Sequence, residues 1–97
     1  MKYITVIADI QAKKDKIEFV KTELCKLVKP TRRECGNINY MFYQDRNDPS
    51  FFHSYENWIN KEVIEKHLKT KHIQEYFENT KDSVSNFEIK YFNKICD

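Results

Sequence analysis

The chain has 97 residues, of which 40% are hydrophobic and 33% are charged, which indicates one small globular domain over residues 1–97. This length excludes a separate cofactor-binding domain, and no stretch approaches the roughly 18 apolar residues needed to cross a membrane. The net charge of +2 is too small for a dedicated nucleic-acid-binding protein. The N-terminal residues lack the apolar segment of an export signal, so we expect a cytoplasmic protein without membrane insertion.

The sequence holds none of the motifs that bind common cofactors. A single glycine cannot form a phosphate-binding loop, and no GxGxxG or GxSxG pattern occurs. The cysteines form no CxxC pair and match neither a disulfide framework nor a zinc knuckle; they are Cys25, Cys35 and Cys96. We therefore expect reduced thiols, with Cys25 buried in a helix, and no cofactor.

The first two elements follow from a change in apolar period. Residues 2–10 alternate between their two faces, with apolar side chains along one of them, which predicts a strand. From Asp15 the apolar residues follow a period of 3.6, which predicts a helix over residues 15–29. Asp15 and Glu18 resemble a capping box at the start of this helix, and Pro30 is expected to end or kink it.

Turn-forming and capping residues divide the rest of the chain. The only glycine, Gly36, stands where the chain leaves the first helix. Asn60 and Thr70 are placed to cap two short helices, with a break between them near Thr70. Three further strands are predicted, the first two joined as a hairpin, over residues 38–44, 51–58 and 87–92.

The resulting order, β-α-β-β-α-β, predicts the ferredoxin-like α+β fold, in which helices cover one face of an antiparallel sheet. Both faces of the strands carry large apolar side chains, as where Tyr40 and Phe42 alternate with Met41 and Tyr43. A monomer has no helices left to cover the second face. We therefore expect a homodimer in which the open sheet faces of two copies pack together.

Most of the aromatic residues fall on predicted strands, among them Tyr40, Phe42, Tyr55 and Trp58. They have two interpretations, which can share residues. The first is a plain core plus a dimer interface. The second is a flat apolar cavity between sheet and helices that binds a ring-shaped ligand.

Two histidines of the helical region are candidates for proton transfer. His67 shares the apolar face of its short helix with Ile64 and Leu68, so its imidazole is expected to point toward the cavity and to take a proton near neutral pH. His72 begins the next helix and is the second candidate. The two lie five positions apart, whereas paired helical metal ligands lie four apart, so we expect no metal site.

Two acidic residues, Glu56 and Glu34, are expected to have mainly structural roles. Glu56 shares a strand face with Trp58, where a carboxylate must be paired or hydrogen-bonded. It either anchors a helix or orients a base. Glu34 belongs to the run Arg32-Arg33-Glu34, which is expected to be a solvated turn with a local ion pair.

Three segments together resemble the antibiotic biosynthesis monooxygenase family, and more narrowly its small quinol monooxygenases. They are the stretch over 31–40, with the pattern Glu-x-Gly-x-x-x-Tyr, the end of the third strand, Tyr55-Glu56-Asn57-Trp58, and the helix break from His67 to His72 and Ile73. They occur in the order and spacing of the family and span nearly the whole chain.

This resemblance implies a dimeric α+β barrel that oxygenates a quinol or similar electron-rich aromatic with dioxygen, without flavin, metal or nicotinamide. It implies His67 or His72 as the base and Glu56 as the group that orients it. Tyr55 and Trp58 would line the substrate pocket.

Two other functions remain open within this resemblance. Members of the same fold also isomerise or degrade phosphorylated signalling sugars, and a non-catalytic small-molecule-binding dimer is the third class. The haem-degrading branch is disfavoured, because Phe77 stands where its axial histidine would be.

Overall fold

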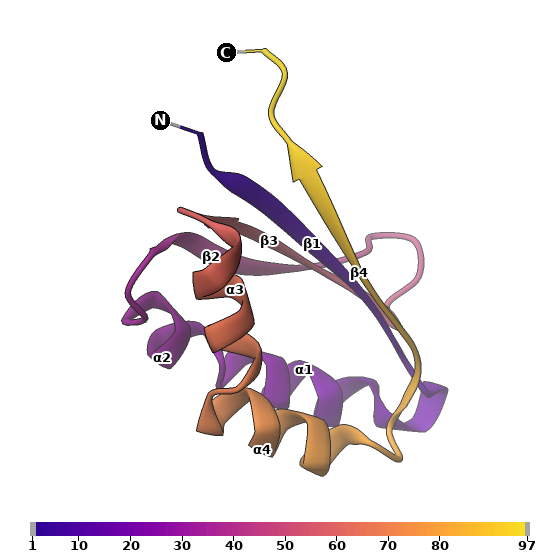
Figure 1. The fold of residues 1–97 in the computed structure, drawn as a ribbon. Helices are drawn as coiled ribbons and strands as arrows, with labels where there is room; N and C mark the ends of the chain where they lie inside the picture. Colours follow the sequence, from indigo (N-terminus) through magenta and orange to yellow (C-terminus); the bar gives the residue numbers. More distant parts are fainter. Residues whose placement is uncertain (1, 97) are drawn as a thin grey trace.

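The computed structural model describes residues 2–96. Its elements are β1 (Ile4–Ala12), η1 (Lys14–Lys16), α1 (Ile17–Cys25), α2 (Val28–Arg32), β2 (Asn37–Gln44), β3 (Phe51–Trp58), α3 (Lys61–Leu68), α4 (Lys71–Thr80) and β4 (Val84–Asn93). The strands form one antiparallel sheet in the order β2-β3-β1-β4, and the helices lie together on one side of it (Figure 1). The predicted ferredoxin-like α+β fold is confirmed.

The first helical region differs from the prediction of one helix over 15–29. Residues Lys14–Lys16 form a 3-10 turn, and α1 begins at Ile17 without a side-chain cap, so the capping box does not form. The helix is interrupted after Cys25, and α2 resumes at Val28. Pro30 lies in the first turn of α2, where its missing N–H leaves no intrahelical hydrogen bond unmade. Its ring lies against the turn four residues earlier, at Lys26, where the helix is interrupted, so the predicted break is present but falls before the proline.

The core lies between the helices and one face of the sheet. In β1 the side chains of Val6, Ala8 and Ile10 are buried, because alternate residues of a strand point to the same face. Helix α1 contributes Val20 and Leu24. Cys25 lies one position beyond this apolar stripe and is exposed, so the expectation of a buried thiol is wrong.

Two side-chain caps fix the break between α3 and α4. Asn60 Oδ1 accepts a hydrogen bond from the backbone N–H of Val63 at 3.0 Å, and Thr70 Oγ1 accepts one from Ile73 at 3.4 Å. Thr70 also donates to the carbonyl oxygen of His67 at 2.7 Å. Both predicted caps are confirmed, and together they bring the end of α3 close to the start of α4.

The other face of the sheet carries no helix (Figure 1). Its exposed aromatic side chains are Tyr43, Tyr55 and Phe92. Polar groups share this face: His53 Nδ1 lies 2.7 Å from Asp9 Oδ1, and Lys90 Nζ lies 3.2 Å from Asp9 Oδ2. Within residues 2–96, no helix combines the length and apolar character needed to span a bilayer.

Candidate active site

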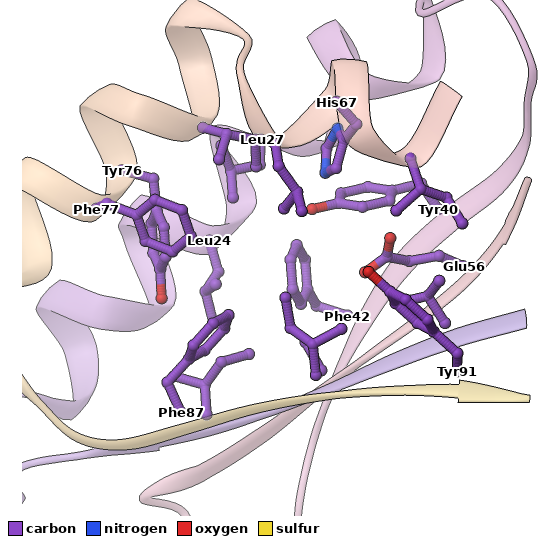
Figure 2. A pocket seen from close by; sticks show the side chains of 17 residues that line it. Leu24, Leu27, Tyr40, Phe42, Glu56, His67, Tyr76, Phe77, Phe87 and Tyr91 are labelled. Atoms are coloured by element: carbon purple, nitrogen blue, oxygen red, sulfur yellow. The ribbon is translucent and has the colours of Figure 1, made fainter. Parts of the chain in front are cut away.

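A pocket lies between the helix-facing side of the sheet and helices α1, α3 and α4 (Figure 2). Its enclosed volume is about 40 Å³, with further open space at its mouth. This is smaller than the roughly 300–1,000 Å³ of ligand-filled sites, so a ring-shaped ligand would have to displace side chains of the wall. The lining residues are mostly apolar, and those that Figure 2 labels are Leu24, Leu27, Tyr40, Phe42, Glu56, His67, Tyr76, Phe77, Phe87 and Tyr91.

Three of the polar residues of this pocket gather at one end. Figure 2 shows His67, Tyr40 and Glu56 at that end, whereas Tyr76 and Phe77 lie at the opposite end. Tyr40 and Glu56 are direct cross-strand partners on β2 and β3. The ring centroids of Tyr40 and His67 are 5.5 Å apart. A ligand bound here would therefore meet His67, Tyr40 and Glu56 at one end and the buried hydroxyl of Tyr76 at the other, with apolar walls between them.

Two histidines share one carboxylate oxygen beside the polar end. His67 Nδ1 lies 2.8 Å from Glu34 Oε2, and His72 Nε2 lies 2.7 Å from the same atom. An ionised carboxylate only accepts hydrogen bonds, so both nitrogens donate to it. The proton of neutral His67 is thereby fixed on Nδ1, which leaves Nε2 as an acceptor.

Exposure rises outward along this triad, which we define as His67, Glu34 and His72. Their side chains are 4%, 14% and 24% exposed, respectively. Burial lowers the pKa of His67 below its usual 6.5, although the hydrogen bond and charge of Glu34 oppose the shift. His67 is therefore neutral at pH 7 and able to take a proton from a bound molecule.

Glu34 corrects the sequence-based assignment of the group that orients the histidine. Glu56 makes its hydrogen bonds to Ser54 and Trp58, not to His67. Glu34 makes the bond to His67 instead, and it is not the solvated turn residue with a local ion pair that we expected. Its partners lie 33 and 38 positions later. The one signal in the sequence is its place two residues before the only glycine, in the turn that leads into β2.

Glu56 is itself a buried group on the pocket wall. Its Oε2 accepts a hydrogen bond from Ser54 Oγ at 2.6 Å, and its Oε1 accepts one from Trp58 Nε1 at 2.9 Å. Ser54 Oγ is in turn held by the backbone N–H of Ala8 at 2.8 Å. Burial raises the pKa of Glu56, against the lowering effect of the bonds from Ser54 and Trp58.

The four residues expected to bind substrate divide into three groups. Tyr40 and Phe42 line the pocket. Trp58 is fully buried behind the wall, with its ring centroid 4.7 Å from that of His67, so it supports the histidine without lining the cavity. Tyr55 lies on the open face of the sheet and is 39% exposed. Its expected place in the pocket is wrong, because it alternates with Glu56 and points the opposite way.

The triad also contains the donor types of a metal site. Its three ligand atoms lie within 4.8 Å of one another. The break between α3 and α4 brings the two histidines together, although their spacing of five residues predicted no shared metal site. Two imidazoles and a carboxylate suit a zinc-type ion. However, the N···O separations of 2.7 and 2.8 Å are shorter than the roughly 3.3 Å between neighbouring ligands of tetrahedral zinc. The arrangement fits a hydrogen-bonded triad better than a metal site.

The strand order, the helices on one face and the pocket between them define a ferredoxin-like α+β domain with an internal pocket. Residues 3–79 match the family described as antibiotic biosynthesis monooxygenase, and the chain belongs to this family. The family inferred from the three sequence segments is confirmed.

Individual relatives agree with this assignment. The uncharacterized protein sll1783 of Synechocystis sp. is 31% identical over 90 residues, which cover 92% of this chain and 61% of that protein. The chain thus spans about three fifths of that relative's length. The crystal structure of PA3566 from Pseudomonas aeruginosa is 29% identical with a TM-score of 0.95, covering 99% of this chain and 97% of its own. Protein SO0527 from Shewanella oneidensis is 26% identical with a TM-score of 0.91, covering 96% and 91%.

Proposed function

We propose that this chain is a cofactor-independent monooxygenase that oxidises a quinol or a similar electron-rich aromatic with dioxygen. The observation that carries the proposal is the His67–Glu34 pair: a buried neutral histidine, with its proton fixed on the side of the carboxylate, at the polar end of an apolar pocket. This arrangement supplies a base beside apolar walls, which the proposed chemistry needs.

The reaction begins with the transfer of a hydroxyl proton from the bound quinol to His67 Nε2. The phenolate that results is richer in electrons than the phenol, so it can pass one electron to dioxygen. Recombination of the two radicals forms a carbon–oxygen bond on the ring. Glu34 stabilises the imidazolium that His67 becomes, through the 2.8 Å contact between Nδ1 and Oε2.

The pocket favours a flat substrate with oxygen at one end. Phe42, Phe77 and Phe87 supply aromatic surface along the wall, where ring faces and edges can pack. No Lys or Arg lines the pocket within the described chain. Phosphate is commonly bound by such cations, so this lining argues against a phosphorylated sugar as substrate.

We also propose that the protein acts as a homodimer through its open sheet face. Tyr43, Tyr55 and Phe92 are exposed there without a covering helix. A specific interface of this kind buries more than about 1,000 Å² in total. The polar cluster of Asp9, His53 and Lys90 on the same face would supply the directional contacts of such an interface.

The test is oxygen consumption by the purified, metal-free protein with a panel of hydroquinones, together with an isomerase assay on a phosphorylated ketose. Oxygen uptake that depends on the protein and on the hydroquinone supports the proposal. Isomerase product without oxygen uptake would replace it with the sugar-phosphate alternative. Ligand binding without either reaction would leave a small-molecule-binding protein.

A further inference from the structure

We infer that Glu56 is the acid of the second half of the reaction: it protonates the oxygen atom that leaves as water when the O–O bond of the substrate hydroperoxide breaks. This inference rests on the proposed oxygenation and goes beyond it, because it assigns a second group that touches the reacting atoms. It also defines the expected product, a hydroxyquinone rather than a quinone.

The position of Glu56 is the first argument. Its carboxyl lines the same pocket as His67 but has separate hydrogen-bond partners. Figure 2 shows the ring of Tyr40 between the two side chains. Tyr40 pairs with Glu56 across the strands, and its ring packs against His67. The two groups thus lie on either side of the Tyr40 ring, and a substrate that spans this ring meets two proton-transfer groups at two different atoms.

The hydrogen bonds of Glu56 are the second argument. Each carboxylate oxygen accepts one bond from the protein, from Ser54 or from Trp58, and a carboxylate offers about four acceptor positions. A proton on either oxygen can therefore point into the pocket while both protein bonds stay in place. The carboxyl is held in one position in both protonation states. A catalytic acid needs this, because it loses its proton and takes up another in each cycle.

The charged surroundings of Glu56 favour its protonated form. The titratable groups around it are His67 on α3, Tyr40 on β2, Tyr91 on β4 and Glu34 in the turn before β2. Burial raises the pKa of Glu56, and the negative charge of Glu34 adds to the shift. Neutral His67 and the two phenols bring no positive charge that would oppose it.

The step balances with a hydroquinone and one dioxygen. The proton first held by His67 passes to the ring-bound peroxide and gives a hydroperoxide on a carbon that still carries hydrogen. His67 then removes that hydrogen as a proton, and its electron pair forms the new carbonyl as the O–O bond breaks. The departing hydroxide takes the proton of Glu56 and leaves as water. The ring carbon is oxidised, the leaving oxygen is reduced, and proton exchange with solvent restores both residues.

Loss of the acid leaves a different route. Without a proton donor at the outer oxygen, the carbon–oxygen bond breaks instead, and the hydroperoxide anion departs with that electron pair. The second ring hydroxyl gives up its proton to this anion, which is released as hydrogen peroxide. The ring is then left as the simple quinone. Both routes consume one dioxygen per hydroquinone, so the share of hydrogen peroxide reports on the acid separately from the rate of oxygen uptake.

The experiment measures oxygen uptake, hydroxyquinone and hydrogen peroxide for the unmodified chain, Glu56→Gln and the control Glu65→Gln, which changes an exposed carboxyl on α3. We expect the unmodified chain and the control to form mainly hydroxyquinone. Glu56→Gln should still take up oxygen but form hydrogen peroxide as its main product. An unchanged product ratio in Glu56→Gln would overturn the inference and leave the proposed function standing.

Two further outcomes are decisive. If the unmodified chain takes up no oxygen with any hydroquinone, the proposed function fails and the inference with it. If Glu56→Gln does not fold, the product ratio of the unmodified chain is measured against pH. A rising share of hydrogen peroxide as pH increases through the pKa of Glu56 supports the acid role, and a ratio independent of pH overturns it.

Discussion

Gly36 packs directly against Val63: a Cβ atom at Gly36 would lie 2.7 Å from Val63 Cγ1. The glycine also has a φ of 90°, a conformation that other residues adopt only with strain. The turn that carries Glu34 toward the two histidines therefore depends on a residue without a side chain.

Gly36→Ala should destabilise the fold by about 2 to 4 kcal/mol, from the left-handed backbone and the forced contact together. Urea denaturation measures the loss. The double variant Gly36→Ala with Val63→Ala removes the two shortest contacts but not the backbone strain, so the added cost of the alanine at position 36 should be smaller in that background. An equal cost in both backgrounds would show that the contact with Val63 contributes nothing.

His67→Ala should lower kcat for oxygen uptake by about 10²- to 10⁴-fold, the usual loss when a general base is removed. The control is Lys66→Ala, its exposed neighbour on α3, which should keep full activity. Circular dichroism confirms that both variants are folded. Full turnover in a folded His67→Ala with unchanged pH dependence would end its assignment as the base; loss in His72→Ala alone would transfer the role to His72.

Glu34→Gln tests the orienting role that the hydrogen bonds give to Glu34. The amide keeps the size of the side chain but loses its charge, so it no longer stabilises the imidazolium of His67. We expect kcat to fall by about 10- to 100-fold, in the range of lost supporting contacts, with the acidic limb of the pH profile, which the pKa of His67 sets, displaced to lower pH. Glu62→Gln, an exposed carboxyl on α3, is the matched control. A pH profile identical to that of the unmodified chain would refute the role.

The burial of His67 also predicts how stability depends on pH. Because burial lowers its pKa in the folded state below the unfolded value of about 6.5, the unfolded chain binds the proton first as pH falls. This contribution to stability is thus present above pH 6.5 and is lost as pH falls toward the folded pKa. Urea unfolding at pH 7.5 and 5.5 should show a larger loss for the unmodified chain than for His67→Gln. An equal or larger loss in the variant would contradict the prediction.

Tyr55→Asp tests the proposed dimer, because Tyr55 lies on the open sheet face and not in the pocket. A carboxylate in the centre of that face would be buried without a partner on association. Sedimentation should show a dimer for the unmodified chain and a monomer for the variant at micromolar concentration. A stable monomer before substitution would refute the dimer itself.

The sequence predicted the strands closely because a period of two is a strong signal, as in β1, where the buried Val6, Ala8 and Ile10 alternate with less buried residues. The same rule could have excluded Tyr55 from the pocket, since Glu56 was already placed on the face of Trp58. The interruption of the first helix was signalled only by Pro30, and its exact place was hidden because the apolar stripe runs on from Leu24 to Leu27.

The role of Glu34 could not be predicted from the sequence. Its role depends on two histidines more than 30 positions away, and spacing along the chain gives no measure of such a distance in space. The sequence located His67 correctly because its helical face is a local property. It could not choose between Glu34 and Glu56 as its partner, because that choice is made by how the turn before β2 packs against the break at Thr70.

The wall that holds Phe87, Ile89 and Tyr91 is a strand at the edge of the sheet, since β4 pairs only with β1. Phe87 is 40% and Tyr91 50% exposed, so these rings reach from the pocket to solvent. An edge strand opens at a lower free energy than a central one. The pocket therefore opens to solvent beside β4, while the central strands β1 and β3 hold Val6 and Glu56 in place, and backbone amides of β4 should exchange with deuterium faster than those of β1.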